Sequence, residues 1–178
     1  VVLGGDHSIN IPCIRAFAGR PLHIVQIDAH LDFVDVRHGV RHGHGNPMRR
    51  AAEQDHVKGI TALGIRNVSS TAKDGYEAAR AMGDDILSVR QIRKLGVEAT
   101  LARIPKGIDY YLTIDIDGFD PSHRSIVEIC HGLMALGCNS AFIQLHGLCG
   151  LDDALDIADA FDGMSGLGDL DAPSGGPT

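Results

Sequence analysis

Short apolar runs alternate with amphipathic stretches along this 178-residue chain. Apolar runs rich in β-branched residues predict strands, and stretches with apolar positions three and four residues apart predict helices. The predicted strands are residues 1–4, 22–28, 57–63, around 86–87, and 109–114. The predicted helices are residues 9–18, a helix beginning at 47, 71–82 and 89–95. Strands that alternate with helices are typical of βαβ units, so the sequence predicts an α/β fold with a parallel sheet.

Local signals support several of these boundaries. Ser8 is a suitable N-cap for the first helix, which Gly19 would close. Pro47 stands where the first position of the second helix is expected. Residues 29–46 show no periodic pattern and contain several Gly, His and Arg. Because long loops in compact domains usually have a function, this segment is expected to contribute to a site.

Composition narrows the classes of function. The chain is 44% hydrophobic and lacks Trp, which allows an aliphatic core of one domain. A net charge of −7 argues against nucleic acid as a main partner, and no apolar run is long enough to span a membrane. The four cysteines lack a C-x-x-C spacing, which favours a reducing, cytoplasmic setting. Residues 1–5 resemble the interior of a strand rather than a signal peptide, so earlier strands of the domain are expected to precede them.

Metal-capable side chains cluster at the carboxyl ends of the predicted strands. Alternate residues of an extended chain point to the same side, which would let acidic and imidazole groups after one strand converge. Ligands of open α/β sheets bind beyond the carboxyl ends of the strands, so groups from different strands are expected to share one pocket. The candidate ligands are His7, Asp28, His30, Asp32, Asp115 and Asp117.

Four carboxylates and two imidazoles in one pocket require a compensating positive charge. Bare carboxylates repel one another, and burial of an uncompensated charge is costly. Two divalent cations would balance the formal charge, and carboxylate and imidazole ligands without thiolate favour manganese first, then cobalt, iron or zinc. Two cations about 3.5–4 Å apart can lower the pKa of a shared water and supply hydroxide near neutral pH. An acidic, solvated rim that holds one adventitious cation is the alternative.

Four motifs resemble the ureohydrolases, the arginase and agmatinase family. They are Gly4-Gly5-Asp6-His7-Ser8, Asp28-Ala29-His30-Leu31-Asp32, His44-Gly45-Asn46-Pro47 and Asp115-Ile116-Asp117-Gly118-Phe119-Asp120-Pro121. Their order and spacing match from Val1 to about Ser122, and the second and third motifs are most similar to agmatinase-type members. The resemblance implies an arginase/deacetylase-like three-layer α/β/α fold with a mainly parallel sheet, here incomplete. It also implies two manganese ions per chain and hydrolysis of a guanidino substrate to release urea.

The resemblance also implies a role for each candidate. Asp28 and Asp115 would bridge the metals, His7 and Asp32 would complete one site, and His30 and Asp117 the other. His44 matches the loop histidine that handles protons near the substrate, and imidazole is suited to protonating an amine leaving group. Agmatine, giving putrescine and urea, is the predicted substrate. Guanidinobutyrate, guanidinopropionate, formiminoglutamate and arginine stay open. Family members usually form trimers or hexamers, which predicts a homo-oligomer.

The resemblance ends near Ser122, which divides the chain into a partial ureohydrolase domain, residues 1–122, and a divergent segment, residues 123–178. Residues 125–178 contain eight acidic residues and no Lys or Arg. Glu128 comes too early in the chain to match the family's guanidinium-binding glutamate, and the Gly/Pro/Ser-rich tail is predicted to be disordered. A shifted reading frame would explain this change of composition, and translation of the other frames of the coding DNA tests that hypothesis.

Two other interpretations stay open. A chain that lacks the family's opening strands and natural ending could bind manganese without turnover, as a non-catalytic remnant. A deacetylase of the same broad fold would hold one zinc ion. Urea release from guanidino compounds tests the first interpretation, and the number of metal ions bound per chain tests the second.

Overall fold

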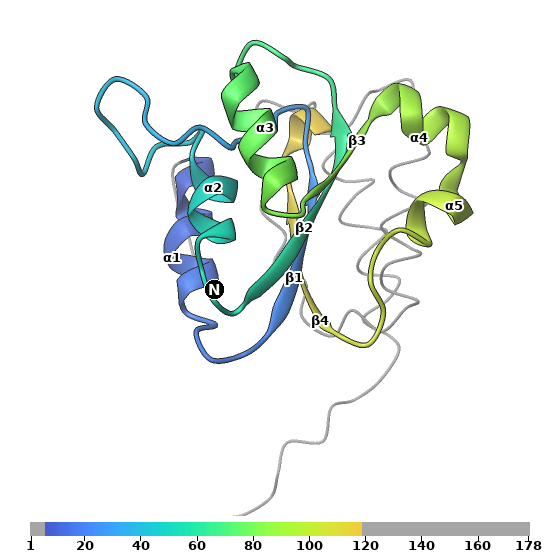
Figure 1. Cartoon of the computed structure of the whole chain (residues 1–178), viewed down its shortest axis with the longest axis horizontal. Coiled ribbons are helices and arrows are strands. Elements are labelled where there is room, and N and C mark those ends of the chain that lie inside the picture. The colour runs from blue at the N-terminus through green and yellow to red at the C-terminus, as the bar shows by residue number, and fades with distance from the viewer. Residues whose placement is uncertain (1–5, 119–178) are drawn as a thin grey trace, which may run out of the picture. The chain divides into compact units, whose positions relative to one another are not determined.

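The structure, a computed structural model, describes residues 6–118. These residues contain a four-stranded parallel sheet of order β3-β2-β1-β4 (Figure 1). The strands are β1 (Leu22–Ile27), β2 (Val57–Ile65), β3 (Asp85–Ser88) and β4 (Asp109–Ile114). The helices are η1 (His7–Ile9), α1 (Asn10–Arg15), α2 (Pro47–Ala52), α3 (Lys73–Ala81), α4 (Val89–Leu95), α5 (Val97–Leu101) and η2 (Ile116–Gly118). The strand predicted at residues 1–4 and all predictions beyond Gly118, including the divergent segment, lie outside the described residues.

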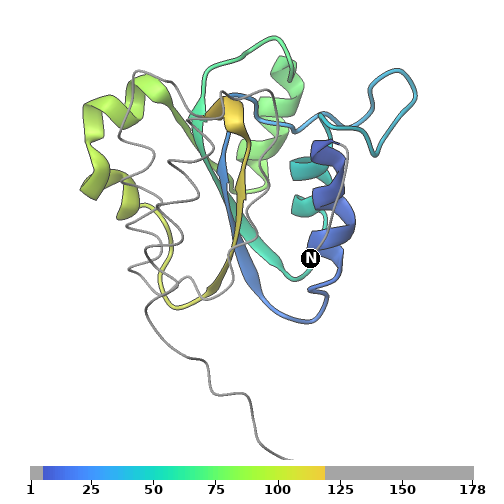
Figure 2. The ribbon, with the colours of Figure 1, turned by 180° about the vertical axis from the view of Figure 1, so that it is seen from behind.

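Helices cover both faces of this sheet. In Figures 1 and 2, α1, α2 and α3 lie on one side of the strands, and α4 and α5 lie on the other. The strand order explains this division, because the chain moves outward from β1 to β3 and then crosses back to β4. Right-handed crossovers in opposite directions place their helices on opposite faces of a sheet. The arrangement confirms the predicted three-layer α/β/α fold with a parallel sheet.

The core lies against β1, which has a neighbouring strand on each side and packs against α2 and α3 on one face. Every residue of β1 is buried, as is typical of the interior strand of a parallel sheet. On one face, Ile24 and Ile60 belong to a cluster with Met48 of α2 and Ala79 of α3. Because β1 is buried and pairs with a strand on each side, its carboxyl end gives the residues that follow it a well-defined position.

The first helix differs from its prediction. Asp6, rather than Ser8, is the cap, because its carboxylate accepts a hydrogen bond of 2.8 Å from the Ser8 amide. The chain then forms a 3-10 turn before α1, which ends at Arg15 instead of residue 18. Asp and Ser are about equally good caps, so the choice between two neighbouring candidates depends on the path of the preceding chain.

Other element boundaries agree closely with those predicted from the sequence. The predicted bounds of α4 and β4 are confirmed, and Pro47 is the first residue of α2. The short α5 was not predicted, because only Gly96 separates it from α4 and it contains five residues. Among residues 6–118, none of the helices combines the length and the apolar character needed to cross a membrane.

Candidate metal centre

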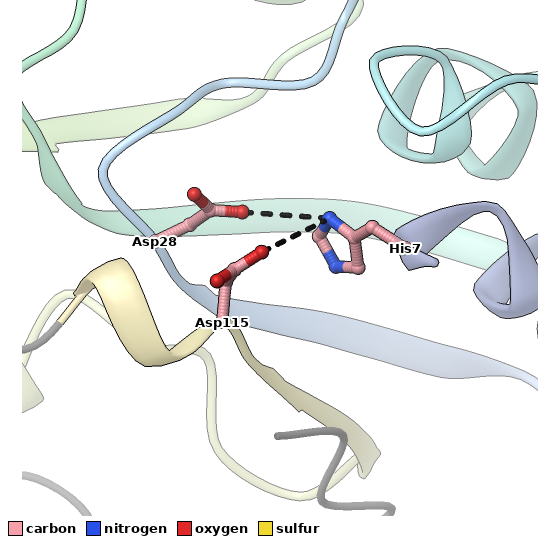
Figure 3. A group of neighbouring side chains, drawn as sticks. All are labelled: His7, Asp28 and Asp115. Carbon is pink, nitrogen blue, oxygen red and sulfur yellow. Dashed lines mark ion pairs between the residues drawn. The ribbon is translucent and has the colours of Figure 1, made fainter. Parts of the chain in front are cut away.

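The candidate metal centre lies where β1 and β4 end side by side. Ile27 and Ile114, the last residues of the two strands, are partners in the parallel register. The next amide along β4, that of Asp115, donates a hydrogen bond of 2.8 Å to the carbonyl of Ile27. Asp28 and Asp115 therefore leave the sheet at the same level. Figure 3 shows their carboxylates pointing toward the imidazole of His7, which η1 carries to the same place.

Five of the six predicted ligands form two overlapping groups. One group is His7, Asp28 and Asp115, and the other is Asp28, His30 and Asp117. Within each group, one possible ligand atom from every residue lies within 4.8 Å of the others. Asp28 belongs to both groups, and a carboxylate shared by two neighbouring sites is suited to bridging two cations.

The distances place one imidazole in each group. His7 Nδ1 lies 3.6 Å from Asp28 Oδ2 and 3.9 Å from Asp115 Oδ2 (Figure 3). His30 Nδ1 lies 2.9 Å from Asp117 Oδ2 and 3.6 Å from Asp28 Oδ1. Both histidines therefore present Nδ1 to the carboxylates.

Asp32, the sixth predicted ligand, lies on the His7 side of the centre. Its Oδ2 is 2.5 Å from His7 Nδ1. The backbone of Asp32 has φ +52°, a left-handed conformation that is uncommon for residues other than glycine. Since β1 ends at Ile27, the groups that follow it converge through this turn and not by alternation along an extended strand.

The pKa values of the cluster show that the site disfavours charged carboxylates without a positive charge beside them. Asp28 is fully buried, and burial raises its pKa to about 7. The hydrogen bond with Asp28 raises the pKa of His30 to about 9. Burial lowers the pKa of His7, but its hydrogen bond with Asp32 and the surrounding carboxylates together raise it above its ordinary value. Without a cation, protons supply the compensating charge.

The donor set fits divalent cations. It combines carboxylate oxygens with imidazole nitrogens and contains no thiolate, a set that suits manganese among other transition metals. A cation would replace the protons that the metal-free cluster holds, because metal ligands must be deprotonated. His7, Asp28, Asp32 and Asp115 could hold one ion, and Asp28, His30 and Asp117 could hold a second.

The metal-free protein is expected to become less stable as pH rises from 6.5 to 9. The folded state holds the His30 proton more tightly than the unfolded chain, since the pKa of His30 rises from 6.5 to about 9. That contribution is fully present below pH 6.5 and is lost as pH rises through the folded value. Thermal unfolding in a chelator should therefore give a midpoint that falls over this range. A midpoint that rises instead would contradict the protonated cluster.

Two polar residues inside the sheet, which were not among the predicted site residues, form hydrogen bonds with residues of the centre. Gln26 and Thr113 are register partners on β1 and β4, each two positions before an aspartate of the cluster. Gln26 Nε2 donates hydrogen bonds to Asp28 Oδ2 at 2.9 Å and to the carbonyl of His30 at 3.0 Å. Thr113 Oγ1 lies 3.2 Å from His7 Nε2. Each of them is a polar residue in an otherwise apolar strand, two positions before an aspartate, and this pattern could have identified them in the sequence.

Residues after β2 support the other group. Asn67 Nδ2 lies 2.9 Å from His30 Nε2. Arg66 donates hydrogen bonds to the main-chain carbonyls of Asp117 and Gly118, which hold η2 beside β2. The Asp117 carboxylate also accepts a hydrogen bond of 3.1 Å from the Ala29 amide. The sequence around residue 66 carries no motif that could have revealed this role.

His44, the predicted catalytic residue, is exposed in the long loop that precedes α2. The structure gives its side chain no hydrogen bond or ion pair with another of residues 6–118. Its loop is anchored nearby, because buried Asn46 donates a hydrogen bond of 2.6 Å to the carbonyl of Val34 and accepts one of 2.8 Å from the Gly43 amide. The imidazole therefore stands on a fixed loop with its ring accessible.

Comparisons with known proteins agree with this fold. Over 175 residues the chain is 34% identical to guanidinopropionase of Pseudomonas aeruginosa, covering 90% of this chain and 53% of that protein. It is 29% identical over 163 residues to guanidinobutyrase of the same organism, covering 78% and 51%. The structure matches formimidoylglutamase from Bacillus subtilis with a TM-score of 0.73 and 23% identity, covering 90% and 57%. The chain spans about half the length of the curated relatives it matches.

A family match covers the whole part of the chain that holds the candidate site. Residues 1–127 match the Arginase family, and this range contains all six candidate metal ligands and His44. The parallel sheet and its helices agree with the fold of that family's solved members. The chain therefore belongs to the arginase family, the ureohydrolases.

Proposed function

We propose that the protein hydrolyses the guanidino group of a small substrate at a centre of two manganese ions and releases urea and an amine. One observation carries this proposal: the fully buried carboxylate of Asp28 belongs to both carboxylate–imidazole groups. A structural role alone gives no reason to bury an aspartate among three further carboxylates. Membership of the arginase family supports the same chemistry.

The proposed ligands follow the two groups of the structure, and the bridging role of Asp115 follows from the family resemblance alone. Asp28 and Asp115 would bridge the two ions, His7 and Asp32 would complete one site, and the remaining two ligands, His30 and Asp117, would complete the other. When bound, the two ions would supply a water of lowered pKa as the nucleophile. Gln26 keeps the Asp28 carboxylate turned toward the centre through its hydrogen bond of 2.9 Å.

His44 is proposed to move the proton that the leaving group needs. Hydrolysis forms a bond between the water oxygen and the guanidinium carbon and breaks the bond from that carbon to the substituted nitrogen. That nitrogen must gain a proton to leave as an amine, and a protonated imidazole can donate it. The exposed ring of His44 on its anchored loop can exchange protons with solvent between turnovers.

Agmatine is the substrate proposed first, with putrescine and urea as products. Guanidinobutyrate and guanidinopropionate are the next candidates, since two of the relatives are named for them. Formiminoglutamate and arginine complete the set. We also propose a cytoplasmic enzyme that assembles as a homo-oligomer, a trimer or hexamer, with no nucleic-acid or membrane partner.

The proposal is tested by product release from the full chain after metal removal and reloading. Urea is measured for agmatine, guanidinobutyrate, guanidinopropionate and arginine, and formamide for formiminoglutamate. Manganese should restore release from at least one compound, and magnesium, which prefers oxygen ligands, should restore far less.

The metal content separates the alternatives. Two bound manganese ions with no product from any compound would contradict the hydrolase and support a non-catalytic remnant. One zinc ion per chain with no urea would support a deacetylase. Metal analysis of the same sample therefore accompanies each assay.

A further inference from the structure

We infer that a buried series of hydrogen bonds, from Tyr111 through Asn10 to Thr113, positions His7 for metal binding. The inference rests on the proposed function, because it takes His7 as a ligand. None of these three residues is itself within a metal-ligating group of the described structure. They act through His7 and are therefore positioning residues.

The series has a defined direction. The Tyr111 hydroxyl donates a hydrogen bond of 2.7 Å to Asn10 Oδ1. This contact sets the orientation of the amide, whose Nδ2 then donates a bond of 2.9 Å to Thr113 Oγ1. Thr113 Oγ1 lies 3.2 Å from His7 Nε2. The four residues are at most 3% exposed, so bulk water has little access to any of these partners.

The hydroxyl of Thr113 can serve both of its neighbours at once. A hydroxyl oxygen has two acceptor positions, so it can accept from the Asn10 amide and from an Nε2–H of His7. A proton held at Nε2 leaves Nδ1 as the nitrogen for a metal, and Nδ1 is the atom that faces Asp28 and Asp115. Partners on the far nitrogen of a ligating histidine fix its tautomer and ring orientation in this way.

The series also joins distant parts of the chain. Tyr111 and Thr113 lie two positions apart on β4, and Asn10 is the first residue of α1. The contacts between Asn10 or His7 and β4 span more than 100 residues of sequence. A buried polar series is favourable only when each member is satisfied, so loss of one member should disturb the ring at its end.

The chain offers a matched control elsewhere in the same sheet. Thr61 Oγ1 lies 2.9 Å from His23 Nε2, and both residues are buried. This pair has the same chemistry as the Thr113–His7 pair but belongs to neither metal group. Thr61→Val should therefore cost stability in the same manner without changing the centre.

The test is calorimetric titration of manganese into the metal-free full chain. Thr113→Val is expected to weaken one of the two binding events by about 10–100-fold and to leave the other unchanged. Thr113→Ser should restore it, and Tyr111→Phe, which frees the Asn10 amide to turn, should give a smaller loss. Thr61→Val should bind both ions as the wild-type chain does. Thermal unfolding of the metal-free variants reports their stability separately.

Each outcome decides the inference. Wild-type affinity for both ions in Thr113→Val would overturn it and leave the proposed function standing. Equal weakening in Thr61→Val and Thr113→Val would also overturn it, because the effect would then follow general stability. If Thr113→Val does not fold, Tyr111→Phe decides in the same titration, because a weakened binding event supports the inference and wild-type affinity for both ions overturns it. A wild-type chain that binds no manganese would instead contradict the proposed function.

Discussion

Replacement of Asp28 by asparagine is expected to abolish tight binding of both metal ions and, with it, urea release. Its carboxylate belongs to both groups of candidate ligands, and asparagine keeps the shape but removes the charge and one ligand oxygen. Loss of an outer partner of a metal ligand typically costs about 10–100-fold in affinity, so loss of a ligand shared by two ions should exceed that. Calorimetric titration with manganese should show two binding events for the wild-type chain and none of comparable affinity for Asp28→Asn.

Two further variants give this experiment its controls. Asp117 belongs to one group only, so Asp117→Asn should retain one tight binding event. Asp109 lies at the other end of β4, half-exposed and paired with Arg20 at 2.9 Å, so Asp109→Asn should retain both. If Asp28→Asn, folded as judged by circular dichroism, still bound two ions, Asp28 would not be the shared ligand.

Gly118→Ala is expected to destabilise the fold and to disrupt the group that contains Asp117. A Cβ at this position would lie 2.7 Å from the amide nitrogen of Asp28, 2.8 Å from the carbonyl carbon of Ile27 and 2.9 Å from the Asp28 Cα. These are backbone atoms at the end of the central strand and cannot move aside, so η2 would have to shift. Overpacking of this kind typically costs about 1–3 kcal/mol. Denaturant unfolding of the metal-free variant measures the loss.

Gly45→Ala is the matched control for this substitution. A Cβ at Gly45 would meet only Arg37 Nη1 at 3.8 Å and Val34 Cγ2 at 3.9 Å, which are ordinary contacts. Its unfolding midpoint should stay close to that of the wild-type chain. Manganese titration of Gly118→Ala should also show a weakened second binding event, and unchanged stability with two intact events would show that η2 can relax at no cost.

Hydrophobic patterning was enough to predict the elements that hold the site. The apolar runs before Asp28 and Asp115 are strands, and both aspartates follow the last strand residue directly. The pairing of β1 with β4 could not be read from the pattern. These strands are neighbours only because the chain crosses back over the sheet after β3. The expectation that the two ends meet came from the rule that ligands bind beyond the carboxyl ends of parallel strands, and the resemblance to the ureohydrolases implied it as well.

The contacts of Gln26 and Thr113 with the centre could not be predicted from the sequence for a different reason. Gln26 and Thr113 act together because the register of β1 and β4 pairs them, and register is a property of the folded sheet. The turn at Asp32 requires a positive φ that residues other than glycine seldom adopt, so no propensity rule would place it there. Asp6 replaced Ser8 as the cap for a similarly local reason, the path of the chain into η1.

The crossover that joins β3 to β4 also sets when the centre can form. Asp28 and Asp115 are brought together by the parallel pairing of β1 with β4, a contact between segments far apart in the chain. Such pairing is slow, because the entropy of closing a long loop is lost before the contact stabilises the chain. During synthesis, no binding-competent centre exists until β4 has been made and has docked. If the centre binds metal as proposed, metal capture would therefore be a late event on the folding pathway, and it would stabilise a sheet that has already formed.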